Sequence, residues 1–270
     1  MNNKNIMSFN LNNGDWLDYS GEDFPIKTFR QITQFDLLSS TVNIPNNYKT
    51  YINNETLNWL KYAERNNKIP QNYQKKINLS PYTTFSKKKS YRAFIDKKIS
   101  FKDFSTILYK AYGYDRSTMT RGYGSGGALY PVNVIIFILN DKTVENLPNG
   151  IYYFQPLTNN LYKLNSLSNF SNKKLKLALY PSKRKPYSNI VIGYAIDLRK
   201  VIRKYKYLGY KNALIELGLM AQSLKNTLPN CMGEYSCQDF NNRLLTSLAN
   251  LDIKNAPIEM VQWLGYIKNE

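Results

Sequence analysis

A chain of 270 residues with 43% hydrophobic side chains is long enough to bury a core, in one large domain or two modest ones. Its formal net charge of +18 favours anionic partners such as phosphates, nucleic acid or acidic polypeptides, without choosing among them. With no histidine and only Cys231 and Cys237, the sequence predicts neither a metal site nor a disulfide framework. It contains no apolar run long enough for a membrane helix and no signal-peptide pattern, so we expect a cytoplasmic protein.

The first 80 residues are weakly patterned and rich in asparagine, and we interpret residues 1–80 as an N-terminal extension that contacts a partner or the substrate. One helix is predicted within it, near residues 55–66, where Leu57, Leu60 and Ala63 form a partial apolar stripe. We interpret residues 81–270 as a single α+β domain.

The clearest local signals lie in that domain. Ser100 is a predicted N-cap, and the helix that follows has apolar residues at helical spacing up to a stop at Gly113. Residues 131–139 predict a strand that is apolar on both faces, as in the centre of a sheet covered by helices. The remaining predicted elements are a hairpin of 150–155 with 161–164, a strand at 189–196, helices at 210–228 and 238–249, and a strand at 258–266.

Three segments carry candidate chemistry. In "KKKSYRAF", residues two apart in an extended chain point the same way, so Lys88, Ser90 and Arg92 can converge on one phosphate. A solvated basic loop is the alternative.

In "RGYGSGGALYP", the glycines permit close approach of the backbone to a flat ligand, and the alternative is a tight turn. The spacing fits neither a Walker loop nor a dinucleotide-binding fingerprint.

The third segment, "RKYKYLGYK", interleaves basic and aromatic side chains at the start of the long predicted helix. Such a pattern can stack the bases of single-stranded nucleic acid, or it can place a proton-transferring group beside a flat ring. A surface helix start is the third reading, and the segment alone does not decide among them.

Taken in chain order, these segments resemble the nitroreductase superfamily of flavin enzymes. More closely, they resemble its SagB-type branch, the thiazole/oxazole dehydrogenases of ribosomally made peptides of the microcin and streptolysin type. "SGGALYP" is similar to the signature of that branch residue for residue. "KKKSYRAF", "NGIYYFQPL" and "KYKYLGYKNALIELG" resemble its other motifs in the same order, so the resemblance spans residues 87–265.

The resemblance implies a three-layer α+β fold, with a mixed, mostly antiparallel sheet between helices, and one FMN per site in a homodimer. Lys88, Ser90 and Arg92 would hold the phosphate and ribityl chain of FMN, and the backbone at Gly233 would approach the flavin. The isoalloxazine would be lined by the stretch that we call the ledge, which consists of Ser125, Gly126, Gly127, Ala128, Leu129 and Tyr130.

The implied reaction oxidises thiazolines or (methyl)oxazolines of a precursor peptide to azoles, together with cyclodehydratase or E1-like partners. FMN accepts the electrons and oxygen reoxidises it. Lys204 and Tyr205 match the Lys-Tyr pair of the branch that is associated with catalysis. The reaction needs a base for the ring Cα proton, and without histidine we favour Lys204, whose positive neighbours favour a neutral amine. Tyr205 would orient the proton or relay it.

The sequence departs from the pattern of the branch at several positions. Gly124 replaces a proline before the ledge, Leu208 and Lys211 replace arginines, and Leu219 replaces a histidine. Two other functions stay open: a flavin reductase or oxidase of the same fold that acts on a small molecule, and a non-catalytic basic binding protein. We do not expect nucleic acid or a membrane as a partner. An acidic leader peptide fits the basic surplus.

Overall fold

The computed structural model describes residues 25–39, 54–55, 57–59, 74–79, 89–167, 169–179 and 186–268. Its contacts divide the chain into two compact units, of which the smaller spans residues 44–88. In the smaller unit, residues 54–55 and 57–59 are helical, and the rest of the helix predicted at 55–66 lies outside the described residues. The larger unit holds all the other elements. The domain boundary near residue 80 stays a prediction.

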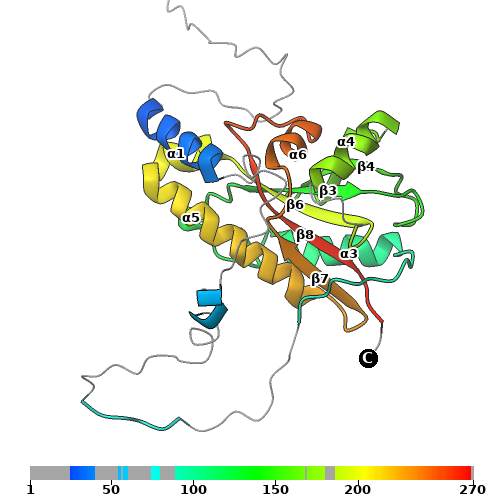
Figure 1. Cartoon of the computed structure of the whole chain (residues 1–270), viewed down its shortest axis with the longest axis horizontal. Coiled ribbons are helices and arrows are strands. Elements are labelled where there is room, and N and C mark those ends of the chain that lie inside the picture. The colour runs from blue at the N-terminus through cyan, green and yellow to red at the C-terminus, as the bar shows by residue number, and fades with distance from the viewer. Residues whose placement is uncertain are drawn as a thin grey trace, which may run out of the picture. The chain divides into compact units, whose positions relative to one another are not determined.

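A six-stranded sheet forms the centre of the larger unit (Figure 1). The strand order is β5-β4-β3-β6-β8-β7, and every neighbouring pair is antiparallel. Its strands are β3 (Val132–Ile138), β4 (Gly150–Gln155), β5 (Asn160–Asn165), β6 (Ile190–Ile196), β7 (Met232–Cys237) and β8 (Ile258–Tyr266). The structure confirms the predicted strands and hairpin, while β7 was not predicted. A separate two-stranded ladder joins β1 (Tyr114–Asp115) to β2 (Thr120–Arg121).

Helices cover both faces of this sheet, as Figure 1 shows. Alternate residues of β3 enter two different hydrophobic clusters: Val134 and Ile136 lie in one, Ile135 and Phe137 in the other. The first cluster also contains α1 (Ile26–Ser39), α3 (Phe101–Tyr112) and α5 (Leu198–Thr227). The second contains α4 (Asn169–Leu179) and α6 (Asn242–Leu248). The three-layer α+β fold is therefore confirmed.

Helix α3 is the element for which local sequence signals predicted both ends. The Ser100 hydroxyl accepts a hydrogen bond from the Asp103 amide at 3.0 Å and donates one to the Asp103 carboxylate at 2.8 Å. At the other end, the Gly113 amide donates to the Tyr109 carbonyl at 2.7 Å. Both caps satisfy backbone groups that a helix end leaves without partners.

Other helices differ from the prediction. α5 begins at Leu198, twelve residues before the predicted start at Tyr210, and Asp197 caps it by accepting from the Lys200 amide at 3.0 Å. α6 is shorter than predicted, and α1 and α4 were not predicted. α1 begins directly after Pro25, whose carbonyl accepts from the Phe29 amide at 3.0 Å, so this proline marks the N-terminal boundary of the helix. Among the described residues, no helix has the length and apolar character to cross a membrane.

Candidate active site

The ledge is a strained and partly exposed turn in front of β3. Its 3₁₀ turn is Gly126–Ala128, and three of its residues have left-handed backbones: Gly127 at φ 65°, Ala128 at 54° and Tyr130 at 48°. The turn is closed by Ser125, whose carbonyl accepts from the Ala128 amide at 3.1 Å and whose hydroxyl accepts from the Tyr130 amide at 2.9 Å. Gly127 and Ala128 face solvent. The ledge therefore presents bare backbone at the surface, in a conformation that its surroundings must hold.

Arg121 supports the ledge from behind. Its guanidinium donates to the Tyr123 hydroxyl at 2.9 Å and lies 4.4 Å from the centre of the Tyr130 ring. Its backbone amide donates to the Tyr130 hydroxyl at 3.2 Å. Burial raises the pKa of Tyr123 to about 12, so this hydroxyl stays neutral and can accept from the arginine. These contacts join both ends of the loop before β3.

Lys204 and Tyr205 reach the ledge from α5, which lies about 80 residues further along the chain. The Lys204 Nζ donates to the Gly127 carbonyl at 3.4 Å. A Cβ on Gly127 would overlap the Tyr205 hydroxyl and lie 2.9 Å from the Lys204 Nζ. A Cβ on Gly126 would lie 2.9 Å from the Asn212 Nδ2. The two glycines are needed because side chains of α5 occupy the space where a Cβ would be.

A sharp bend in α5 presents this pair. Lys206 has φ 52° and ψ −130°, which separates a short first segment of the helix from the long second one. A non-glycine residue in such a conformation costs of order 1–3 kcal/mol. Gly209 packs so closely on the first segment that a Cβ would overlap the Val201 carbonyl. Gly209 thus has a structural reason, since only glycine fits under Val201.

Glu216 lies beneath the ledge, and the sequence analysis did not select it. Only 1% of its surface is exposed, and neither carboxylate oxygen has a hydrogen-bond partner among the described residues. Burial raises the pKa of Glu216 to about 7, and the neighbouring Ser125 hydroxyl and the positive charge of Arg121 partly oppose this shift. An acidic residue within the apolar pattern of "ALIELGLM" is the signal that could have identified it.

The predicted phosphate-binding residues lie elsewhere. Ser90 and Arg92 are exposed, and the Arg92 guanidinium stacks 4.5 Å from the centre of the Tyr235 ring on β7. Lys88 lies outside the described residues. The backbone beside them is fixed, because the Tyr91 amide donates to the Glu234 carbonyl at 2.8 Å.

Gly233 belongs to this second group. It lies in β7 opposite Gly265, and a Cβ would overlap the Tyr91 ring and lie 2.7 Å from Ile267. The structure thus brings the predicted residues together in two groups: Lys204 and Tyr205 with the ledge, and Ser90 and Arg92 with Gly233. A role of the Gly233 backbone toward a flavin stays a prediction.

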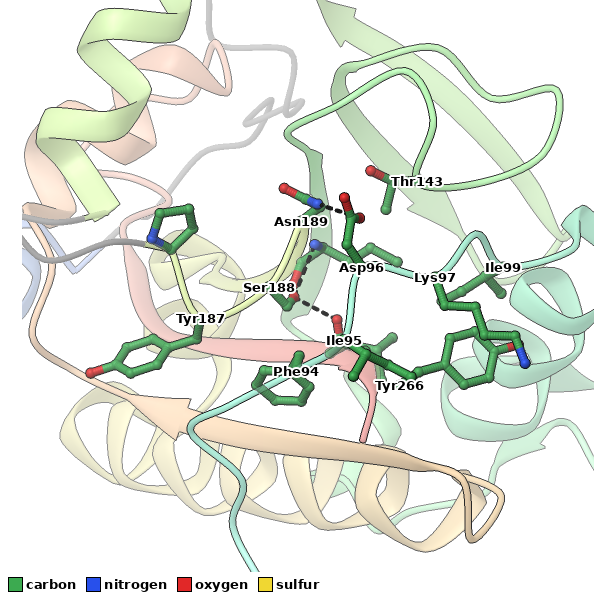
Figure 2. Close-up of a pocket in the computed structure, with 14 residues that line it drawn as sticks. Phe94, Ile95, Asp96, Lys97, Ile99, Thr143, Tyr187, Ser188, Asn189 and Tyr266 are labelled. Atoms are coloured by element: carbon green, nitrogen blue, oxygen red, sulfur yellow. Dashed lines mark hydrogen bonds between the residues drawn. The ribbon is translucent and has the colours of Figure 1, made fainter. Parts of the chain in front are cut away.

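A hollow of about 230 Å³ lies between residues 94–97, 186–190 and 264–266 (Figure 2). Hydrogen bonds join the segments that line this hollow: Asn189 donates to the Asp96 carboxylate at 3.1 Å, and the Ser188 hydroxyl donates to the Leu264 carbonyl at 2.5 Å. None of the predicted site residues lines it. We therefore place the candidate active site at the ledge rather than in this hollow.

Comparisons with known proteins agree with this architecture. No family model matches the chain. It is 29% identical over 209 residues to the microcin B17-processing protein McbC of Escherichia coli, covering 72% of this chain and 73% of that protein. A chain of the solved E. coli microcin synthetase McbBCD complex, with truncated pro-MccB17 bound, superposes with a TM-score of 0.77 at 24% identity, covering 90% of this chain and 94% of that one. A structure assigned as a nitroreductase, from Ralstonia eutropha, superposes with a TM-score of 0.53 at 16% identity, covering 70% and 89%.

The fold and its neighbours define the class: this is a protein of the nitroreductase fold, and an oxidoreductase. Its ledge is built from the "SGGALYP" signature, and Lys204 and Tyr205 of the Lys-Tyr motif contact that ledge. Within the class, these motifs resemble those of the SagB-type dehydrogenases, and the similarity to McbC points in the same direction.

Proposed function

We propose that this protein oxidises thiazolines or (methyl)oxazolines of a precursor peptide to the aromatic azoles, using FMN. The proposal rests on one observation: Lys204 and Tyr205 both contact the exposed backbone at Gly127. It places an amine and a phenol beside a surface that a flat ring can approach. The similarity to a microcin B17-processing protein supports a peptide substrate.

The residues at the ledge fit a flavin. Gly126 and Gly127 let α5 bring Tyr205 and Lys204 against the backbone, and the backbone at Gly127 faces solvent, where a flat ring can approach it. Ser90 and Arg92 are the described residues that would hold the phosphate, with Lys88 as the third member of the predicted set. Bound FMN would accept the hydride that each ring loses, and with it the two electrons of the oxidation.

The chain's own contribution to the reaction is the handling of the proton. The Lys204 Nζ would accept the proton on the ring Cα, because it is the amine that contacts the ledge. Tyr205 is half-buried, and the Lys204 Nζ lies 5.1 Å from the centre of the Tyr205 ring. Tyr205 would therefore orient the amine. The Lys204 side chain is exposed in the single chain, so the substrate or a second copy must exclude water there.

An apolar stripe on α5 supports the expected homodimer. Leu208, Ile215 and Leu219 are spaced seven and four residues apart, so they share one face of the helix, and each is exposed. A Cβ on Gly124 would lie 3.8 Å from Leu219, which shows that the stripe adjoins the ledge. A second copy on this stripe would cover the candidate active site. The likeness to a chain of a synthetase complex with a bound precursor supports partner proteins and a peptide that docks through the basic surface.

The experiment is mass spectrometry of an azoline-containing peptide incubated with the purified protein. We expect the loss of two hydrogens per ring, and Lys204→Ala is expected to stop this loss while FMN stays bound. Reduction of small nitro compounds or free flavins without any change in the peptide would instead favour the small-molecule oxidoreductase. Colourless, folded protein that takes up no FMN would favour the non-catalytic binding protein.

A further inference from the structure

Helix α1 packs on the part of α5 that carries the candidate catalytic pair. Phe29 and Ile32 of α1 are buried in the same hydrophobic cluster as Leu198 and Val201 of the first α5 segment. The Arg199 guanidinium lies 5.7 Å from the centre of the Phe29 ring. α1 therefore holds the stretch of α5 that precedes Lys204.

The same helix also contacts α5 after the bend. The Tyr207 hydroxyl donates to the Gln31 side chain, and the Tyr210 hydroxyl donates to the Asp36 carboxylate at 3.3 Å. The contacts of α1 thus lie on both sides of Lys204 and Tyr205, and the strained Lys206 lies between them. Since a bend of this kind persists only where its surroundings fix it, α1 is well placed to maintain the geometry of the pair.

Two carboxyl groups join α1 to the sheet at this point. Asp36, only 2% exposed, interacts with Glu259 of β8 as well as with Tyr210. Burial raises the pKa of both Asp36 and Glu259, and burial and the two carboxyl charges raise the pKa of Tyr210. The two acids can remain in contact by holding one proton between them. The cluster of Asp36, Tyr210 and Glu259 joins α1, α5 and β8.

We propose that α1 is a positioning element for Lys204 and Tyr205, and that Asp36 secures it by bonding Tyr210 and Glu259. The effect of α1 on catalysis rests on the proposed function, whereas the hold of α1 on α5 does not. A segment outside the recognisable family motifs would then be required for the geometry of the active site. Because the shared proton is lost as the pH rises through the raised pKa values, α1 should hold α5 less firmly above those pKa values than below them.

The test compares Asp36→Ala with Asp36→Asn in the full-length protein. Alanine removes the acceptor of the Tyr210 hydroxyl and the partner of Glu259. Asparagine keeps an acceptor and offers an N–H to Glu259 that does not titrate. Amide hydrogen exchange over residues 199–210 reports the hold of α1 on α5, and it does not depend on catalysis. Azoline oxidation is measured in parallel with FMN affinity, from pH 6 to pH 9.

For Asp36→Ala we expect exchange over residues 199–210 to accelerate at least tenfold and kcat to fall about tenfold. The KM for the peptide and the affinity for FMN should stay within twofold of the wild type. Asp36→Asn should restore kcat and slow exchange, and its exchange over residues 199–210 should depend less on pH than that of the wild type. Should Asp36→Ala fail to fold, Gln31→Ala removes an exposed contact of the same helix and should accelerate the same exchange about threefold.

Unchanged exchange and unchanged kcat in Asp36→Ala would overturn the proposal, as would an Asp36→Asn variant as impaired as the alanine one. Unchanged exchange in Gln31→Ala, where only that variant folds, would also overturn it. A wild-type protein that oxidises no azoline would refute the proposed function alone, because the exchange experiment still decides whether α1 holds α5.

Discussion

Replacing Gly127 with alanine tests whether the candidate pair acts at the ledge. The backbone there has φ 65°, which costs an L-residue roughly 1–2 kcal/mol. The new Cβ would also overlap the Tyr205 hydroxyl and lie 2.9 Å from the Lys204 Nζ. Both atoms end flexible side chains, so we expect the side chains to move while the fold remains. The cost in stability corresponds to a fall in Tm of about 2–8 °C.

Displacing a positioned acid–base group costs about 10²–10⁴ in rate. We therefore expect Gly127→Ala to lower kcat for azoline oxidation about 100-fold, measured by mass spectrometry of a peptide substrate under saturating FMN. The matched control is Gly218→Ala in the same helix as the pair, where a Cβ meets nothing within 4 Å. Alanine is favoured over glycine in a helix, so this control should be at least as stable as the wild type. A folded Gly127→Ala variant with wild-type kcat would refute the reasoning.

Three further variants test other parts of the structure. Glu216 holds its proton up to about pH 7 when folded, so the free energy of unfolding should fall between pH 4.5 and 7, by at most about 3 kcal/mol. Glu216→Gln should remove that fall in urea titrations, and an unchanged slope would contradict this assignment. Lys225→Met removes the ammonium group 3.0 Å from the buried Glu234 carboxylate and should lower the free energy of unfolding by about 3 kcal/mol in the same titrations. The double variant Lys225→Met with Glu234→Gln should recover that free energy. Ile215→Lys should convert a dimer to a monomer in analytical ultracentrifugation, and a dimer that persists would exclude the α5 stripe as its interface.

Local signals predicted part of the fold correctly because those elements depend on neighbours in the sequence. The ends of α3 follow from the Ser100 cap and the Gly113 stop. Strands β3 and β6 are apolar on both faces because helices cover the sheet on both sides. For α5, the first segment contains basic and aromatic residues and ends at a bend, so its helical start was not visible in the periodicity.

The site depends on contacts between distant residues, which a periodicity cannot show. The "GG" of the ledge and the "KY" of α5 were selected separately, and only the resemblance joined them before the structure placed both at Gly127. α1 escaped prediction because its apolar residues do not follow one clear stripe: among the described side chains, Phe29 and Ile32 face the core, whereas Ile26 and Phe35 are exposed. The roles of Ser90, Arg92 and Gly233 toward FMN stay predictions.

The left-handed backbones at Gly127, Ala128 and Tyr130 have a consequence for protein engineering. The two hydrogen bonds that Ser125 makes within the heptapeptide "SGGALYP" are not enough to offset three left-handed residues, so the isolated peptide should relax to less strained dihedral angles. Grafting the signature onto another scaffold should therefore fail to transfer the activity, unless Arg121 and the bent helix are transplanted with it. The sequence of the motif is therefore not sufficient for its conformation, which depends on the contacts with Arg121 and α5.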